Sequence, residues 1–237
     1  MEQNILKFKQ DFQESGMLDY IKKDYDVIMV WIAGSTITGL ADSGSDYDLG
    51  VLISNNIEST KYVRNDNFLI YKPEGRKVQW MYETVEDITT KQPVFRLRNI
   101  GWAQFRNIDD RFIIYKNPKY LPFIQSLIAR SLEISLYSMY LFYLNKVEVI
   151  QDIVAAGYIP AKCRLRSLYH LCWIYDSLFS TEFDRDFLVK VKHIMDIPVD
   201  NETLEKIYQK VVKLYNYFTE YIPARPTIDF ERNNTDG

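Results

Sequence analysis

Two apolar runs on either side of a loop rich in glycine, serine and aspartate place the strongest constraint on the fold of this chain. The first run, residues 26–33, is apolar and β-branched for the length of one strand, and the second, residues 49–53, follows the loop directly. A run without polar alternation, like the first, is typical of a strand buried on both faces. We therefore expect two strands with a polar loop, residues 34–48, between them.

The rest of the first half predicts one helix and three further strands. Apolar residues recur at helical spacing before Gly16, which favours an N-terminal helix that ends near this glycine. The sequence between 67 and 83 is typical of two strands around a tight turn at 73–76. The expected strands are 67–71, 77–83 and 112–115.

The second half, from about residue 121, lacks such turn signals and predicts helices. The expected helices are 121–146, 161–180, 183–196 and 201–220. Residues 223–237 form a polar, proline-containing tail. The prediction is an α+β fold, with an α/β domain over 1–120 and a helical domain with its tail over 121–237.

Composition narrows the classes of function. Lys and Arg number 29 against 32 Asp and Glu, which excludes strong bulk attraction to nucleic acid or anionic lipid but leaves room for a local basic patch. Two cysteines and two histidines exclude a disulfide framework and disfavour a four-ligand zinc site. The longest apolar stretch, residues 134–144, is too short to span a bilayer, and the N-terminus is too polar for a signal peptide. We expect a soluble, cytoplasmic protein without a membrane partner.

The loop between the two apolar runs carries the residues with chemical potential. Gly34 and Ser35 end the first strand, and a glycine there lets a phosphate approach the backbone closely. Asp46 and Asp48 lie two apart at the entrance to the next strand, so both side chains are expected on one face. Two adjacent carboxylates repel each other unless a cation lies between them, and Mg²⁺ favours such oxygen ligands. A solvated turn between two strands is the alternative interpretation.

A family resemblance rests on this loop. Gly34-Ser35, ten intervening residues, then Asp46-Tyr47-Asp48 and an apolar strand resembles the signature of the DNA polymerase β-like nucleotidyltransferase superfamily. Two weaker similarities extend it: residues 99–115, and the basic-x-Leu-Tyr-His pattern at 166–171, are similar to segments of predicted nucleotidyltransferases from phages and bacteria.

The resemblance implies a nucleotidyltransferase-like mixed sheet with flanking helices and a phosphoryl transfer that uses two metal ions. Asp46 and Asp48 would hold Mg²⁺ or Mn²⁺. An acceptor hydroxyl of unknown origin would attack the α-phosphorus of an NTP, with ATP as the first choice, and pyrophosphate would leave. The residues expected to bind the nucleotide are Gly34, Ser35, Thr36, Ser45 and Arg166.

This sequence departs from the family pattern at the third carboxylate. By resemblance that acid is expected near Gln79, an amide, which offers a carbonyl to a metal but cannot take a proton. Glu83 lies four residues further on the same strand face and is the other candidate for the third position. The departure leaves open a second function: a catalytically weak relative that binds a nucleotide, RNA or a partner protein.

The helical half offers a basic cluster and a histidine. Lys162, Arg164 and Arg166 precede His170, which is four residues beyond Arg166 and expected on the same helix face. Such a cluster would clamp a triphosphate or an RNA backbone, or it would be a solvated helix start with a core histidine. The spacing from Arg164 to His170 also meets the loose pattern of the HEPN ribonucleases, although Leu165 departs from it. A HEPN-like ribonuclease is the third functional hypothesis.

Overall fold

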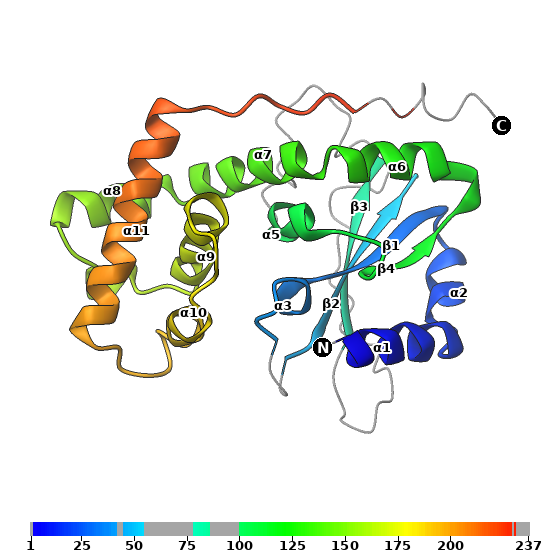
Figure 1. The fold of residues 1–237 in the computed structure, drawn as a ribbon, viewed down its shortest axis with the longest axis horizontal. Coiled ribbons are helices and arrows are strands. Elements are labelled where there is room, and N and C mark those ends of the chain that lie inside the picture. Colours follow the sequence, from blue (N-terminus) through cyan, green and yellow to red (C-terminus); the bar gives the residue numbers. More distant parts are fainter. Residues whose placement is uncertain (1, 42–44, 55–77, 86–99, 229, 231–237) are drawn as a thin grey trace. The chain divides into compact units, whose positions relative to one another are not determined.

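The structure is a computed structural model, shown in Figure 1, and it describes most of the chain. The described residues are 2–41, 45–54, 78–85, 100–228 and 230. They form two compact units. The first runs up to Ser135 and includes the segment that begins at Arg225, and the second covers Leu136–Ala224. The predicted α+β class is confirmed, with the sheet in the first unit and helices in the second.

The sheet is mixed and has four strands in the order β3-β2-β1-β4. They are β1 (Val27–Ala33), β2 (Tyr47–Ile53), β3 (Val78–Thr84) and β4 (Ile113–Lys116). β1 pairs antiparallel with both β2 and β4, whereas β2 pairs parallel with β3. The four predicted strands in these regions are confirmed within two residues. The expected strand 67–71 and the turn at 73–76 lie outside the described residues.

The register of the strands brings three polar segments to one end of the sheet. Ala33, the last residue of β1, lies opposite Asp48 near the start of β2, because these strands are antiparallel. Asp48 in turn lies opposite Gln79 near the start of the parallel strand β3. The loop after β1, the loop before β2 and the first residues of β3 therefore meet at this end.

The two faces of the sheet are covered by different elements. Helix α1 (Glu2–Glu14) packs on one face, where the ring of Phe8 stacks on Tyr47 with centroids 4.1 Å apart. On the other face Trp31 of β1 contacts Trp102 and Phe105, at 5.3 and 5.8 Å between ring centroids. These two residues belong to α5 (Ile100–Ala103) and to the 3-10 turn η2 (Gln104–Asn107).

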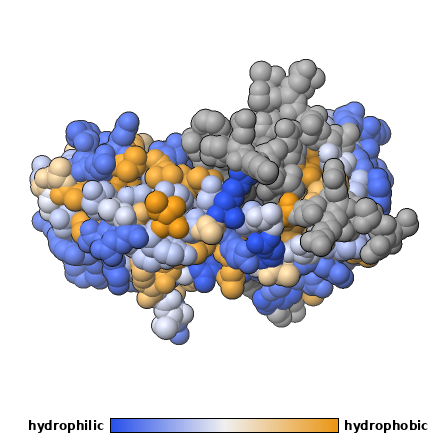
Figure 2. Space-filling model, turned by 90° about the horizontal axis from the view of Figure 1, so that it is seen from above, coloured by the Kyte–Doolittle hydropathy of each residue, from blue (hydrophilic) through white to orange (hydrophobic). Residues whose placement is uncertain are grey.

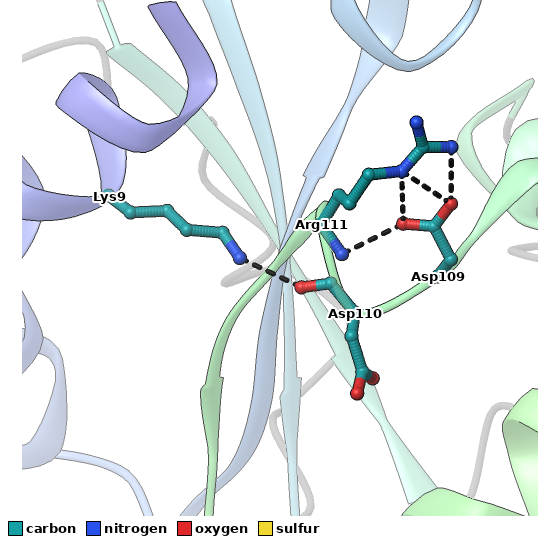
Figure 3. A network of polar contacts seen from close by, with 4 residues as sticks. All are labelled: Lys9, Asp109, Asp110 and Arg111. Carbon is teal, nitrogen blue, oxygen red and sulfur yellow. Dashed lines mark hydrogen bonds and ion pairs between the residues drawn. The ribbon is translucent and has the colours of Figure 1, made fainter. Parts of the chain in front are cut away.

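A polar network connects α1 to the turn before β4 (Figure 3). Lys9 donates from Nζ to the backbone carbonyl of Asp110 at 2.8 Å. The guanidinium of Arg111 donates to both carboxylate oxygens of Asp109, and the backbone N–H of Arg111 donates to Asp109 Oδ1 at 2.8 Å. Partial burial lowers the pKa of Lys9 despite the nearby carboxylates.

The N-terminal helix that was predicted from its apolar spacing is confirmed as α1. It is followed by a short helix, α2 (Met17–Lys22), that was not predicted.

At the opposite end of the sheet, the carboxylate of Asp26 binds three side chains. Asp26, just before β1, accepts hydrogen bonds from Tyr120 and from Ser54 Oγ, the latter at 2.9 Å, and pairs with Lys119. These three partners come from the end of β2 and from η3 (Pro118–Tyr120), which follows β4. Asp26 therefore connects the segments that flank three of the strands.

The second half of the chain is helical, as predicted, but the expected helices 121–146, 161–180 and 183–196 are shorter or divided in the structure. The predicted helix 121–146 is two helices, because the backbone at Arg130 leaves the helical region with φ −104° and ψ 14°. Asp184 and Asp200 cap their helices by accepting from Phe187 N and Thr203 N at 3.1 and 2.7 Å. The helices are α6 (Leu121–Ala129), α7 (Ser131–Leu144), α8 (Val147–Ala156), α9 (Ser167–Phe179), α10 (Arg185–Lys192) and α11 (Asn201–Glu220).

The C-terminal segment returns to the first unit. Ile228 is buried, and the ring of Phe230 contacts Phe123 edge-on, with centroids 4.8 Å apart, as well as Tyr120. The segment that carries Ile228 and Phe230 therefore belongs to the first unit in the structure. The predicted domain boundary at residue 120 stays a prediction; in the structure α6 belongs to the first unit.

Charged and apolar side chains share the surface. On the face drawn in Figure 2, hydrophobic residues lie among hydrophilic ones. The large apolar side chains that are more than half exposed are Leu6, Leu132, Tyr158, Met195, Ile197 and Ile222. Within the part of the chain that the structure describes, none of the helices has both the length and the apolar character of a membrane-spanning segment.

Candidate active site

The turn after β1 requires a glycine for two reasons. Gly34 has φ +68°, the left-handed region in which a residue with a Cβ is strained. A Cβ built on Gly34 would also lie 2.0 Å from Oδ2 and 2.8 Å from Cβ of Asp48. The absence of a side chain at Gly34 therefore lets the β1 turn lie directly against the Asp48 carboxylate, before any ligand is considered.

The backbone of this turn is held by a residue from a distant part of the chain. Gln104 in η2 is only 4% exposed, and its Oε1 accepts a hydrogen bond from Gly34 N at 2.9 Å. Gln104 thus contacts the turn at its first N–H.

The two aspartates flank a buried tyrosine. Tyr47 lies in the core against Phe8, whereas Asp46 and Asp48 are partly exposed. Tyr47 and Asp48 are consecutive residues of β2, so Asp48 lies on the face opposite α1. Gln79, the strand neighbour of Asp48, donates from Nε2 to Asp46 Oδ2 at 3.4 Å. The structure therefore brings an amide, and two carboxylates, together where the family pattern would have three acids.

Glu83 does not reach this group of residues. It pairs with Leu52 in the parallel register, four residues beyond Gln79, which corresponds to roughly 13 Å along the strand. Its side chain is buried at 4% exposure. Of the two candidates for the third position, Gln79 is the one beside the aspartates.

The other predicted nucleotide-binding residues of the first unit follow the same turns. Ser35 is partly exposed in α3 (Gly34–Ile37), while the side chain of Thr36 is buried. The Ser35 carbonyl accepts from Leu40 N at 2.9 Å and from Thr38 Oγ1 at 3.1 Å, which closes the short helix. Ser45 is partly exposed directly before Asp46.

The donor set suits a hard divalent cation. Asp46, Asp48 and the amide carbonyl of Gln79 offer oxygen atoms, which Mg²⁺ and Mn²⁺ favour over nitrogen and sulfur. Within the described residues, no group of three or more His, Cys, Asp or Glu side chains is arranged so that it could hold a metal ion. The residues present therefore fit a site with two carboxylates rather than three.

A comparison with protein families shows which family this part of the chain resembles. Residues 15–115 match the family model described as nucleotidyltransferase domain. The chain carries a nucleotidyltransferase domain. Its match covers β1, β2 and β3, and with them the Gly34 turn, both aspartates, Gln79 and Gln104. Comparison with curated proteins gives no match.

The nucleotidyltransferase domain confirms the family predicted from the sequence, consistent with the polymerase β-like superfamily. It indicates nucleotidyl transfer as the general activity and a nucleotide as a substrate.

The basic cluster lies outside the nucleotidyltransferase domain, in the second unit. Helix α9 begins at Ser167, so the expected helix start at 161 is wrong: Lys162 lies in a 3-10 turn that ends at Cys163, and Arg164 follows it. Lys162 pairs with Asp152 at 2.9 Å, and Arg166 is exposed. The 3-10 bonds, from Cys163 N to the Pro160 carbonyl and from Arg164 N to that of Ala161, replace the first expected turn of helix.

His170 is placed among aromatic rings in the helical unit. It contacts Phe142 and Tyr169 at 5.5 and 5.0 Å between centroids. Burial, together with the charges of Arg166 and Lys146, lowers the pKa of His170 to about 4, so the imidazole is neutral at pH 7. This favours the interpretation of His170 as a packed histidine near Arg166.

Gln104 is the residue of this site that sequence reasoning missed. The available signal was a polar residue between the aromatic side chains of Trp102 and Phe105, all within one buried segment. That pattern shows that an amide is buried, but it does not identify the partner, which lies 70 residues earlier in the chain.

Proposed function

We propose that this protein is a Mg²⁺-dependent nucleotidyltransferase that moves a nucleoside monophosphate from an NTP, ATP first, to a hydroxyl acceptor. The observation that carries the proposal is the convergence of Gly34, Asp46 and Asp48 at one end of the sheet, within the matched domain. The acceptor oxygen would form a bond to the α-phosphorus while the α–β phosphoanhydride bond breaks and pyrophosphate leaves.

The chain's own residues supply position and charge. Asp46 and Asp48 would hold Mg²⁺ or Mn²⁺, which when bound neutralises the phosphate charge that builds up during transfer. The phosphates would bind at the turn of Gly34 and Ser35, with donors from the Ser35 and Ser45 hydroxyls and from the backbone N–H of Thr36, whose side chain is buried. Arg166 remains a proposed phosphate ligand from the helical unit.

The proton of the acceptor hydroxyl has no fixed base beside the aspartates in this proposal. Gln79 occupies the position of the third acid and cannot accept a proton, so the proton would pass to water or to a phosphate oxygen. Loss of a general base costs a factor of roughly 10²–10⁴ in rate. We therefore expect slow turnover.

A second function is favoured by the same observation. Gln79 donates a hydrogen bond to Asp46 where a third carboxylate would instead attract a second metal. A catalytically weak relative that binds a nucleotide, RNA or a partner protein would use the same fold without rapid transfer.

One experiment separates the two functions. The protein is incubated with each α-labelled NTP, Mg²⁺ and a cell extract, and transfer of label to any acceptor is followed. Asp48→Asn should abolish transfer, while Asp110→Asn, the same change at an exposed acid of the same unit, should leave it unchanged. Transfer at the unaltered level by Asp48→Asn would refute the assignment of the site. Tight NTP binding without transfer would support the weak relative.

A further inference from the structure

Gln104 is a polar residue inside an apolar layer. It is one of four consecutive buried residues, 102–105, whose aromatic members pack on Trp31 beneath the end of the sheet. Burying an amide costs free energy unless its polar atoms find partners. The partner of the Gln104 carbonyl oxygen is the N–H of Gly34, at 2.9 Å.

This hydrogen bond acts on the most permissive position of the turn. A glycine adopts positive and negative φ about equally well, so sequence alone does not fix the conformation of Gly34. In the structure Gly34 lies between two side chains: Gln104 accepts its N–H, and Asp48 occupies the space on its Cα. Both contacts are made with the backbone of Gly34 at φ +68°.

The same contact determines which backbone donors are available. The N–H of Gly34 is already bound to Gln104, so it is not available to an anion. Donation from the turn therefore has to come from residues after Gly34. The directions of these N–H groups depend on the conformation of Gly34, because the orientation of each peptide plane is determined by the backbone angles that precede it.

We propose that Gln104 is a positioning residue of the nucleotide site, which holds the Gly34 turn in the conformation that admits the phosphates of an NTP. The inference rests on the proposed function. Gln104 acts through Gly34 and is not itself assigned a contact with the nucleotide. Without this acceptor the turn samples other conformations, and part of the binding free energy is spent on restoring the productive one.

The test compares two variants of the same buried segment. Gln104→Met keeps the length of the side chain and removes the acceptor. Phe105→Leu removes core packing against Trp31 but leaves the acceptor in place. Calorimetric titration with a non-hydrolysable ATP analogue and Mg²⁺ gives the nucleotide affinity of each variant, and circular dichroism gives its thermal stability.

A second measurement reads the contact itself. The chain has nine glycines, so a spectrum of the protein labelled with ¹⁵N-glycine contains few amide signals. Labelling alanine carbonyls with ¹³C as well selects glycines that follow alanine, which are Gly34 and Gly157. The substitution Gly157→Asn, at a left-handed position with open space around it, leaves the signal of Gly34 alone.

We expect Gln104→Met to weaken nucleotide binding roughly 5- to 100-fold and to accelerate hydrogen exchange of the Gly34 amide. Phe105→Leu should lower the thermal stability but leave both readouts unchanged, and Gln104→Glu, which keeps an acceptor, should retain protection of the Gly34 amide. Equal nucleotide affinities for the unaltered protein and Gln104→Met would overturn the inference alone. Failure of the unaltered protein to bind any NTP would overturn the proposed function and this inference with it.

Discussion

Replacing Gly34 with alanine should destabilise the first unit by more than its unusual backbone conformation alone explains. A left-handed residue with a Cβ is strained by about 1–2 kcal/mol. The new methyl group would also lie 2.0 Å from Asp48 Oδ2 and 2.8 Å from Asp48 Cβ. Rotation of Asp48 moves its carboxylate away but not its Cβ, so the backbone has to shift, and overpacking of this kind costs about 1–3 kcal/mol more.

The chain contains a matched control for this substitution. Gly16 belongs to the same unit and has φ +69°, but an added Cβ meets no atom within 4 Å. Gly16→Ala therefore measures the backbone strain alone. We expect a loss of about 1–2 kcal/mol for Gly16→Ala and about 2–5 kcal/mol for Gly34→Ala. In a chain of this size these correspond to decreases in Tm of roughly 2–8 °C and 4–20 °C.

Urea unfolding followed by circular dichroism would measure both losses under the same conditions. Equal losses for Gly16→Ala and Gly34→Ala would refute the reasoning, because the Asp48 contact would then contribute nothing. The comparison also bears on tests of nucleotide binding. Any larger side chain at Gly34 displaces Asp48 first, so reduced affinity in such a variant does not by itself prove a contact between Gly34 and phosphate.

Three further predictions concern other contacts of the first unit. Gln79→Asp should increase both Mn²⁺ affinity, measured by calorimetry, and transfer rate, because a third carboxylate beside Asp46 favours a cation; an unchanged affinity would contradict this. Gly50→Ala should lower the free energy of unfolding by about 1–3 kcal/mol, because the new Cβ would lie 2.1 Å from the Trp31 ring. The loss should be much smaller in a protein that also carries Trp31→Leu. An equal loss in that protein would exclude the ring as the cause. Tyr120→Phe should lower the free energy of unfolding by about 1 kcal/mol at pH 7, a value discounted for the partial exposure of Asp26. This difference from the unaltered protein should shrink as the pH falls below 4. A difference independent of pH would count against the hydrogen bond.

The sign of this pH dependence follows from the partners of Asp26. Partial burial raises the pKa of its carboxyl, but hydrogen bonds from Tyr120 and Ser54 and the charge of Lys119 outweigh that effect and hold the pKa below its ordinary value. A carboxyl with a lowered pKa in the folded state stabilises the fold above its unfolded pKa. This contribution is lost as the pH falls through the folded pKa.

The sequence predicted those parts of the fold that depend on local patterns. The strands at 26–33 and 49–53 were predictable because residues 27–33 and 49–53 are all buried, which gives each run its apolar character. Helix α11 was predicted at its observed bounds, where a capping aspartate, Asp200, precedes an amphipathic pattern.

What the sequence did not predict depends on contacts between distant residues. The hydrogen bond from Gly34 to Gln104 joins positions 70 residues apart, and no local pattern specifies it. The parallel pairing of β3 with β2 is likewise a matter of tertiary register, and it separates Gln79 from Glu83 as candidates for the third position. Helix α8 and the 3-10 turn at 161–163 were missed because short elements carry a weak periodic signal.

The return of the C-terminal segment to Tyr120 and Phe123 makes the helical unit an insertion within the first one. A ribosome releases the nucleotidyltransferase domain well before the residues that complete its packing. The nascent first unit therefore has an uncovered apolar site around Phe123 until Ile228 and Phe230 emerge. Final closure of the first unit therefore waits until the second unit has been synthesised, and a stop codon placed before Ile228 should lower the protease resistance of the first unit.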